Sequence, residues 1–332
     1  MSRLQLKVTG IAHETTLIRR IELASTDGVP LPGFAAGAHI SIDVPEVGVR
    51  KYSLVNALGE AGATNSPKAY VVGVRLDAEG GGGSRFMHGL KIGDTVTTEA
   101  PKNDFPLRPS TAPALLIGGG IGITPLITMA AELSAQGRPF HLVYAVRHRE
   151  ECAFLPALAS LSQGAVEIHD DAACGRLLDI AGRFAALGAD QHVYMCGPKP
   201  MLKAGIAASR RLGWSPDRLK FELFYSAAAP VVPVSAPAVA RSADDPFEVE
   251  IRSSGQVFLV PSGKTILDVL VEAGVDPIHD CKRGECGICQ VGVVSGVPDH
   301  RDVILSEVER AANKVMQICI SRAKSPRLVL DL

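Results

Sequence analysis

The chain contains 332 residues, enough for two or three ordinary domains. Hydrophobic residues make up 46% of it and charged residues 21%, which excludes a largely disordered chain and a collagen-like one. A net charge of −1 gives no reason to expect a nucleic-acid partner or an anionic membrane surface. The sequence has no transmembrane-length apolar run, and its first residues lack the apolar core of a secretion signal, so we expect a cytoplasmic protein.

The first part of the chain, residues 1–108, reads as short strands separated by Gly and Pro. Residues 16–23, 39–44 and 70–75 are rich in β-branched residues and alternate in part between polar and apolar side chains. Short strands with this punctuation are typical of a small antiparallel β-barrel. We therefore predict a β-barrel domain over residues 1–108.

The pattern of predicted secondary structure changes in residues 109–228. The apolar run Ala114–Ile117 is followed by a glycine-rich turn and an apolar helical stripe, and further strand candidates lie at 141–146 and 192–195. Thr124 suits a helix N-cap and Pro125 the first helical position. The order of strand, turn, helix and strand predicts an α/β domain built on a parallel sheet.

A segment rich in Pro and Ala follows, and it shows neither helical nor strand periodicity. We interpret residues 229–246 as a linker between domains, because so long a stretch is unusual as a loop inside one domain. Beyond it, residues 247–251 and 256–260 alternate as strands, and residues 265–273 form a helical pattern that ends at Gly274. We predict a small α+β domain over residues 247–332.

The C-terminal domain contains a cysteine pattern that points to iron–sulfur chemistry. Cys281, Cys286 and Cys289 follow the spacing C-x4-C-x2-C, and Cys319 lies far downstream. This spacing matches a plant-type [2Fe–2S] cluster. A zinc site is less favoured because zinc ribbons use two paired motifs, and a disulfide framework does not suit an odd cysteine count in a chain without a secretion signal.

Two short motifs in the barrel domain gain meaning from their order. Arg50-Lys51-Tyr52-Ser53 begins a strand candidate. Further along, four consecutive glycines precede Ser84, and the last two of them are Gly82 and Gly83. Taken alone, the first motif usually consists of surface and core residues of no special role, and the glycine run usually forms a flexible loop. Glycine backbone at a helix start can bind a phosphate, because free N–H groups converge there.

The whole order of motifs resembles the ferredoxin-NADP reductase superfamily. R-x-Y-S, G-G-S, G-G-G-I-G-I-T-P and C-G-P follow one another, and the C-terminal ferredoxin pattern narrows the resemblance to the phthalate dioxygenase reductase family, which includes vanillate O-demethylase reductases. The resemblance implies an FMN-binding β-barrel at 1–108, an NAD-binding α/β domain at 109–228 and a β-grasp ferredoxin at 247–332.

The resemblance also implies the roles of single residues. The positions that match the family's FMN site are Arg50, Tyr52, Ser53, Val74, Arg75, Gly82, Gly83, Ser84, Thr124 and Phe224. Relatives often carry Arg where Gly81 stands here, so the phosphate has one cation fewer unless the neighbouring Arg85 replaces it. Cys196 matches a cysteine near the nicotinamide ring, although taken alone a buried core thiol is the simpler interpretation.

The nicotinamide site is also visible in the residues themselves. Glycine backbone and a helix N-terminus follow a strand at Gly118–Pro125, which is what a pyrophosphate needs, and a C-G-P turn follows a later strand. The residues assigned to this site are Gly118, Gly119, Gly120, Gly122, Cys196, Gly197 and Pro198. Residues 147–151 contain both Arg and Glu, so they leave NADPH and NADH open, and the resemblance favours NADH.

Redox chemistry fixes the order of the cofactors. Nicotinamide gives up two electrons as a hydride, a plant-type cluster accepts one at a time, and a flavin can do both. We therefore predict an NADH-dependent electron-transfer enzyme with no catalytic acid, base or nucleophile. By resemblance its partner is a Rieske-type oxygenase, and we expect a monomer. The alternatives are a reductase for a cytochrome or separate ferredoxin, and an electron-carrier module without nicotinamide activity.

Overall fold

A computed structural model describes most of the chain. The described residues are 3–56, 64–78, 80–161, 164–215, 217–224, 244–279, 282–284, 287–305 and 307–332. The predicted ligands Cys281 and Cys286 and most of the predicted linker lie outside these residues. The chain divides into two compact units. The first covers residues 1–44, 49–78 and 82–224, and the second is built on 225–332.

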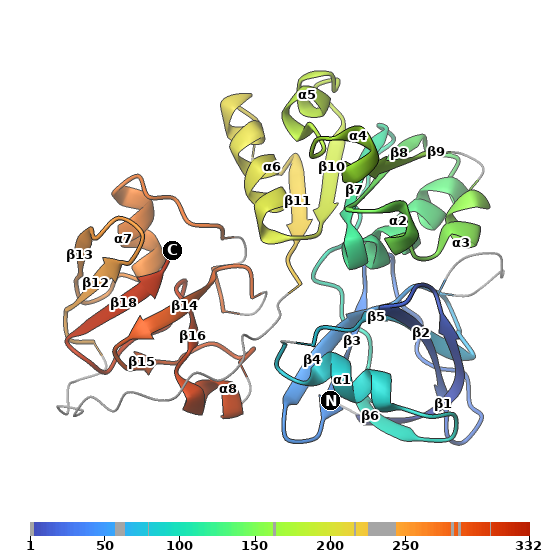
Figure 1. Ribbon diagram of the computed structural model, residues 1–332, viewed down its shortest axis with the longest axis horizontal. Coiled ribbons are helices and arrows are strands. Elements are labelled where there is room, and N and C mark those ends of the chain that lie inside the picture. Colours follow the sequence, from blue (N-terminus) through green and yellow to red (C-terminus); the bar gives the residue numbers. More distant parts are fainter. Residues whose placement is uncertain are drawn as a thin grey trace. The chain divides into compact units, whose positions relative to one another are not determined.

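The amino-terminal part of the first unit is an antiparallel barrel with strand order β4-β3-β6-β1-β2-β5 (Figure 1). Buried residues alternate along its strands, as Leu6 and Val8 do, so one face of each strand fills the interior. A bridge between Leu54 and Val72 joins the two ends of this order and nearly closes the barrel. Its strands and helix are β1 (Arg3–His13), β2 (Ile18–Ser25), β3 (His39–Val44), β4 (Gly48–Ser53), β5 (Ala69–Arg75), β6 (Thr95–Glu99) and α1 (Gly83–Gly89).

The rest of the first unit is a parallel sheet with strand order β11-β10-β7-β8-β9. Helices connect its strands, as strand–helix–strand crossovers require. Its strands are β7 (Ala114–Gly119), β8 (Phe140–Val146), β9 (Gly164–Asp170), β10 (His192–Cys196) and β11 (Leu219–Glu222). Its helices are η1 (Gly120–Gly122), α2 (Ile123–Ala135), η2 (Arg149–Glu151), α3 (Leu155–Ala159), α4 (Asp171–Cys174), α5 (Ile180–Ala185) and α6 (Lys199–Arg211).

The two faces of this sheet bury different neighbours. Leu116 and Tyr194 point to the face covered by α2, whereas Leu115 and Val193 point to the face covered by α5 and α6. The core on the α2 face also includes barrel residues such as Val55. The barrel and the parallel sheet therefore share one hydrophobic core, and burying it stabilises both.

The second unit contains a mixed sheet with strand order β13-β12-β18-β14-β16 and the helix α7. Thr265 caps α7 through a capping box with Asp268, and the buried Ile266, Leu267 and Leu270 face the sheet core. The elements are β12 (Phe247–Ile251), β13 (Val257–Val260), α7 (Ile266–Glu272), β14 (Gln290–Ser295), β15 (Pro298–Asp299), α8 (Glu307–Ala312), β16 (Val315–Gln317), β17 (Arg322–Ala323) and β18 (Arg327–Asp331). This arrangement and the first unit confirm the predicted multidomain fold class.

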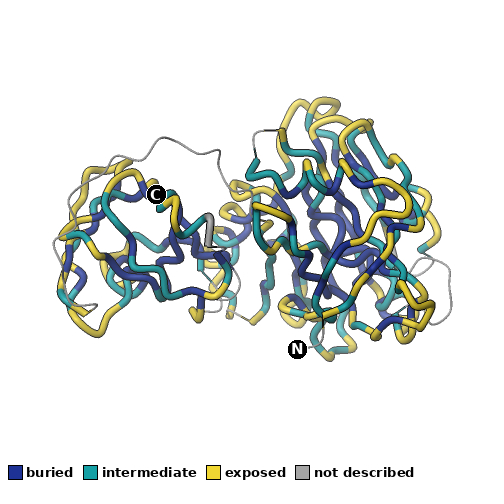
Figure 2. The backbone as a smooth tube through the Cα atoms, turned by 90° about the horizontal axis from the view of Figure 1, so that it is seen from below, coloured by how far each residue is buried: buried dark blue, intermediate teal, exposed yellow. Residues whose placement is uncertain are grey.

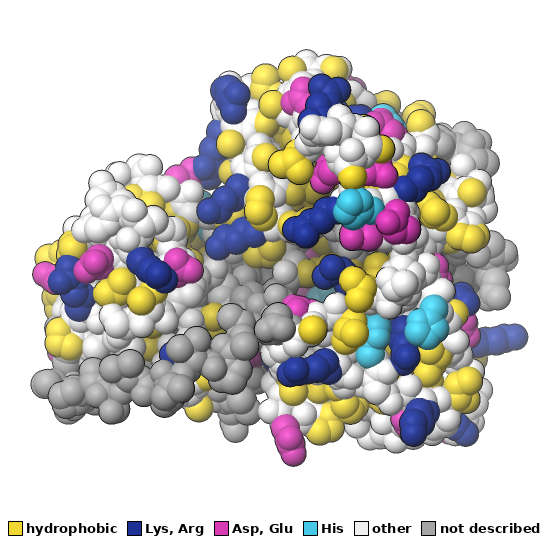
Figure 3. Space-filling model, viewed as in Figure 1, with side chains coloured by type: hydrophobic (Ala, Val, Ile, Leu, Met, Phe, Trp, Pro, Cys, Tyr) yellow, Lys and Arg dark blue, Asp and Glu magenta, His cyan; other side chains and the backbone are white. Residues whose placement is uncertain are grey.

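Buried backbone runs through the interior of each unit and exposed backbone follows the connecting loops (Figure 2). Charges of both signs are interspersed over the visible face of the first unit, apart from basic side chains along α6 (Figure 3). That helix carries Lys199, Lys203, Arg210 and Arg211 and no acidic residue. Within the described part of the chain, no helix has the length and apolar character needed to span a bilayer.

Candidate functional site

The glycine loop before α1 lies directly against β4. A Cβ atom on Gly83 would stand 2.9 Å from Cγ of Arg50 and 3.3 Å from Oη of Tyr52, so only a residue without a side chain allows this approach. Gly82 has a φ of 96°, a left-handed conformation that favours glycine. The structure thus brings together three of the residues predicted for a flavin site. Burial raises the pKa of Tyr52 far above its usual range, so this phenol stays neutral.

Ser84 and Arg85 have structural partners of their own. The Ser84 hydroxyl accepts a hydrogen bond from the backbone N–H of Asp77 (3.0 Å) and is 3.3 Å from the Asp77 carbonyl oxygen. Arg85 is exposed, and its Nη1 donates to the carbonyl of Ala78 at 3.3 Å. Both contacts fix the chain that leads into the glycine loop.

The strand β5 connects the barrel site to the start of α2. A Cβ atom on Gly73 would stand 3.0 Å from Cγ2 of Thr124, so this strand, which also carries Val74 and Arg75, packs directly on Thr124. Thr124 is buried and donates to the carbonyl of Ile121 at 2.9 Å. The predicted Thr124 N-cap is wrong, because the turn η1 runs directly into α2 and Gly122 occupies the N-cap position.

The glycine turn after β7 and the C-G-P turn after β10 interlock. A Cβ atom on Gly119 would stand 2.6 Å from Cδ of Pro198, and one on Gly122 only 2.2 Å from the carbonyl oxygen of Cys196. Gly197 is equally close, because its Cβ would lie 3.0 Å from Cα of Gly119. Both turns follow the carboxyl ends of adjacent parallel strands, where α/β sheets bind their ligands. The structure therefore unites the residues predicted for the nicotinamide site.

Glu222 lies beside the predicted nicotinamide site, although no sequence pattern singled it out. It lies opposite Cys196 in the parallel pairing of β10 and β11. Its Oε2 atom is buried and has no hydrogen-bond partner among the described residues. Burial raises the pKa of Glu222 to about 8. Burial also raises the pKa of the Cys196 thiol, and the Glu222 charge adds to that shift, so the thiol remains protonated.

Charged groups of the barrel act on Glu222 from the other side. The Lys51 ammonium favours the ionised carboxylate, and the Asp104 carboxylate opposes it. Lys51 and Asp104 form an ion pair at 2.9 Å, and His39 lies 3.9 Å from the same carboxylate. Burial, followed by the Lys51 charge, lowers the pKa of His39 to about 4, so its imidazole is neutral.

Four further residues from the segments predicted to bind cofactors lie at the edges of this region. Ser53, the last residue of β4, is buried. Phe224 follows β11 and is partly exposed, so its ring is accessible beside the carboxyl end of the sheet. Arg147 and Arg149, at the end of β8, are exposed, and the backbone N–H of Arg149 donates to the carboxylate of Asp170 at 3.0 Å.

The second unit brings Cys289 and Cys319 together. Both are buried, and the adjacent Cys289 side chain lowers the pKa of Cys319 to about 7, with a further contribution from the backbone of Gly284. The five described cysteines, Cys152, Cys174, Cys196, Cys289 and Cys319, form no disulfide bonds. Cys281 and Cys286, the other two predicted ligands, lie outside the described residues.

Two described glycines in the loop near these thiols have left-handed backbone conformations. Gly284 and Gly287 have φ values of 72° and 78°, which favour glycine. A Cβ atom on Gly284 would stand 2.7 Å from Cγ2 of Ile320, so the loop lies close against the segment that carries Cys319. Buried thiols with a nearby backbone N–H suit a [2Fe–2S] group, whose sulfurs accept such hydrogen bonds.

Asp302 shapes the neighbouring segment. Its buried Oδ1 accepts hydrogen bonds from the backbone N–H groups of Leu305 (2.8 Å) and Ile304 (3.2 Å). The backbone N–H of Val303 donates to the carbonyl of Gly284 at 3.3 Å, and the Val303 side chain is 77% exposed. An apolar side chain thus stands in solvent beside the loop of the predicted cluster.

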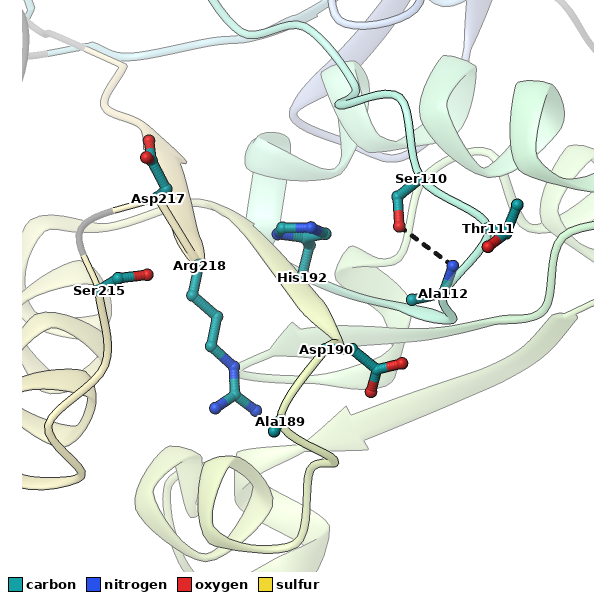
Figure 4. Close-up of a pocket in the computed structure, with 9 residues that line it drawn as sticks. All are labelled: Ser110, Thr111, Ala112, Ala189, Asp190, His192, Ser215, Asp217 and Arg218. Atoms are coloured by element: carbon teal, nitrogen blue, oxygen red, sulfur yellow. Dashed lines mark hydrogen bonds between the residues drawn. The ribbon is translucent and has the colours of Figure 1, made fainter.

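A separate pocket lies at the opposite edge of the parallel sheet. It is formed by the segment before β7, the start of β10 and the segment before β11 (Figure 4). His192 and Arg218 line it together with Asp190 and Asp217, so its charges are mixed. None of the predicted cofactor residues lines this pocket, and Arg218 is held by the carbonyl of Gln191 and by the Trp214 ring.

Comparisons with known proteins agree with this geometry. Residues 249–324 match the family model of the 2Fe-2S iron-sulfur cluster binding domain, and residues 116–205 match that of the oxidoreductase NAD-binding domain.

The chain is also similar over nearly its full length to characterised proteins. It is 39% identical to tetrachlorobenzoquinone reductase of Sphingobium chlorophenolicum, over 100% of this chain and 99% of that protein. It is 39% identical to vanillate O-demethylase oxidoreductase of Pseudomonas sp. (strain HR199 / DSM 7063), over 94% of each. Among solved structures, phthalate dioxygenase reductase matches with a TM-score of 0.63 and 34% identity, over 100% of this chain and 98% of that one.

Proposed function

Because the chain belongs to the phthalate dioxygenase reductase family, we propose that it is the reductase component of an oxygenase or demethylase system. In this role it takes electrons from NADH, passes them through FMN to a [2Fe–2S] cluster and delivers them to the oxygenase. Relatives named as subunits or reductases of such systems support the oxygenase partner. The Rieske type of that oxygenase, a monomeric state and a cytoplasmic location are further parts of the proposal.

One observation carries the proposal. The interlocked turns at Gly118–Gly122 and Cys196–Pro198 stand at the carboxyl edge of the parallel sheet, and Thr124 beside them packs on barrel strand β5. The predicted nicotinamide site and the predicted flavin site therefore adjoin within one unit that shares a core. Such adjacency is what a direct hydride transfer between two cofactors requires.

The protein's own residues bind, orient and exclude water. Arg50 and the backbone at Gly82–Gly83 would hold the FMN phosphate, with Tyr52, Ser53 and Val74 along the flavin. The glycine turns would hold the NADH pyrophosphate and place its ring beside Thr124, Cys196 and Phe224. The Cys196 thiol is protonated and buried, so it fills space beside the ring without presenting a charge. When bound, FMN supplies the conversion between a two-electron donor and a one-electron acceptor.

The four cysteines Cys281, Cys286, Cys289 and Cys319 would hold the cluster. We also keep the division into domains 1–108, 109–228 and 247–332, with a linker at 229–246, as part of the proposal.

The test uses the purified protein with NADH under anaerobic conditions. We expect an oxidised spectrum with flavin and iron–sulfur bands that NADH bleaches in both regions, and FMN as the flavin released on denaturation. The candidate oxygenase should turn over only when the reductase and NADH are both present. Absence of the iron–sulfur bands, or release of FAD, contradicts the proposal.

A second acceptor class has its own support. The full-length similarity to tetrachlorobenzoquinone reductase suggests a quinone as a direct electron acceptor. Steady-state NADH oxidation with a halogenated benzoquinone, compared with the candidate oxygenase, distinguishes the two. A kcat/KM far higher for the quinone favours this second candidate.

A further inference from the structure

Two buried glutamines lie beside the cysteine pair of the second unit. Gln290 is the first residue of β14 and Gln317 the last of β16, and they stand directly opposite each other in the antiparallel pairing. Their exposed fractions are 6% and 0%. Amide side chains this deeply buried need hydrogen-bond partners, so their partners indicate what they do.

The two amides and Cys289 form a short hydrogen-bonded chain. Nε2 of Gln317 donates to Oε1 of Gln290 at 2.7 Å, and the Cys289 thiol donates to Oε1 of Gln317 at 3.4 Å. One donor of this hydrogen-bonded group is unsatisfied, because Nε2 of Gln290 is buried and has no partner in the described part of the protein. This assignment of the two amide groups requires a hydrogen on the Cys289 sulfur.

A cysteine that ligates iron does so as a thiolate and has no hydrogen to donate. The carbonyl of Gln317 would then face a negatively charged sulfur with no hydrogen between them. Turning both terminal amides over removes this conflict, and the two ends of an amide have nearly the same shape, so no other atoms need to move. Nε2 of Gln317 then donates to Cys289, and Oε1 of Gln317 accepts from Nε2 of Gln290. The buried donor of Gln290 then has a partner, and its Oε1 occupies the position that Nε2 held before.

We propose that Gln317, held in place by Gln290, donates a hydrogen bond to the Sγ atom of Cys289 and thereby raises the reduction potential of the [2Fe–2S] cluster. The inference rests on the proposed function, since it takes Cys289 as a cluster ligand. An N–H group pointing at a ligand sulfur favours the more negatively charged, reduced cluster, and hydrogen bonds to the sulfurs are among the factors that set such potentials. Gln317 is a positioning residue that acts through Cys289.

The experiment is a redox titration of the cluster in the full-length holoprotein. Gln317→Met removes the donor at nearly constant length. We expect the iron–sulfur spectrum to remain and the equilibrium constant for reduction to fall about tenfold, which is ~59 mV for a one-electron couple. The matched control is Met316→Leu, a change in the neighbouring buried side chain of the same strand, which should leave the potential unchanged.

A double variant separates the electronic effect from a packing defect. Gln317→Met alone leaves both polar ends of Gln290 buried without a partner, so it should lower the thermal stability of the second unit. Gln290→Met combined with Gln317→Met removes that defect and should recover stability, while the potential stays as low as in the single variant. If the single variant does not load a cluster, the double variant provides the measurement.

The outcomes distinguish this inference from the proposed function. A wild-type holoprotein without iron–sulfur absorption contradicts the proposed function. A loaded Gln317→Met or double variant with the wild-type potential overturns the hydrogen bond to Cys289. An equal shift in Met316→Leu also overturns it, because the shift would then come from general repacking of β16.

Discussion

Cys196 and Glu222 stand directly opposite each other in the parallel pairing of β10 and β11, at the edge of the sheet where the two glycine turns interlock. The carboxyl group of the half-buried Glu222, whose shielded Oε2 has no hydrogen-bond partner among the described residues, therefore adjoins a buried thiol at the predicted nicotinamide site. Burial raises the pKa of Glu222 to about 8, so this carboxyl group is mainly neutral at neutral pH. If this edge binds the nicotinamide as proposed, a neutral Glu222 adds no negative charge there that would favour the positively charged, oxidised form.

The first prediction concerns the pH dependence of Glu222→Gln. Between the ordinary pKa of a glutamate, 4.5, and the raised pKa of about 8, the folded protein retains a proton that the unfolded chain releases. This group therefore makes the free energy of unfolding fall as pH rises through that range. Glutamine stays neutral, so the stability of the variant relative to wild type should increase from about pH 5 to about pH 8 and then level off. Urea unfolding across this range, followed by a signal from the first unit, measures the difference.

The exposed Glu150→Gln provides the control for Glu222→Gln, because its side chain is in solvent in both states. A stability difference for Glu222→Gln that does not change with pH would show that the carboxyl group titrates as in the unfolded chain. Parallel pH profiles of NADH oxidation report whether ionisation of this group also affects turnover.

Some of these relationships are local in the chain and others are not. Cys286 and Cys289 are separated by only two residues, and the glycines of Gly118–Gly122 are likewise close together in the chain. The sequence therefore predicts the chemistry of each motif directly. Glu222 stands opposite Cys196 only because β11 pairs with β10 in one particular register. A sequence pattern does not set that register, and a lone Glu in a short strand gives no separate signal.

Two further features could not be predicted from the sequence, because they too depend on tertiary packing. Thr124 has the residue type of an N-cap, but the preceding turn η1 moves the start of α2 to Ile123, and tertiary packing overrides the local preference. Gln290 and Gln317 are brought together by an antiparallel pairing between distant segments. The fold class was predictable because strand and helix periodicity depend only on neighbouring residues.

The second prediction compares Arg50→Ala with Arg85→Ala. Arg50 contacts Gly83 of the glycine loop, whereas Arg85 is exposed and bonded to a backbone carbonyl. A charge-assisted hydrogen bond contributes about 1.5–3 kcal/mol, so loss of Arg50 should weaken FMN binding roughly tenfold to a hundredfold. Arg85→Ala should weaken it much less. Flavin fluorescence titration of the apoprotein measures both affinities, and a larger loss for Arg85→Ala would show that Arg85 supplies the phosphate contact.

The third prediction tests the cluster ligands with Cys289→Ser. The variant should lose the iron–sulfur absorption, while NADH still bleaches the flavin, because the two sites lie in separate units. It should also destabilise the second unit, since metal binding is coupled to folding. Cys286→Ser should behave in the same way, and Cys174→Ser, at an exposed cysteine, is the control. A complete cluster spectrum in Cys289→Ser contradicts the ligand assignment.

The fourth prediction tests the contact between the two glycine turns with Gly122→Ala. The backbone of Gly122 has a right-handed φ of −62°, so alanine is strained only by its Cβ atom, which would stand 2.2 Å from the Cys196 carbonyl oxygen. Backbone cannot move aside as a flexible side chain can, so we expect a loss of about 1–3 kcal/mol in stability and a raised KM for NADH. Gly89→Ala meets no atom within 4 Å and serves as the control. Equal behaviour of the two variants would show that the turns can separate without cost.

The fifth prediction concerns the path of electrons out of the protein. Each unit has its own hydrophobic core, and the core of the second unit is drawn wholly from residues after 246, so deleting residues 247–332 should leave the first unit folded. The truncated protein should bind flavin, oxidise NADH and reduce artificial two-electron acceptors at close to the full-length rate, because the residues assigned to both cofactors precede residue 225. Turnover of the oxygenase should fall to background, since the cluster is the proposed last carrier before the partner.

Adding the separately expressed fragment 247–332 with its cluster should restore part of that turnover by a second-order reaction. Oxygenase turnover by the truncated protein at the full-length rate would mean that the flavin reduces the partner directly, and the order from NADH through FMN to the cluster would be wrong.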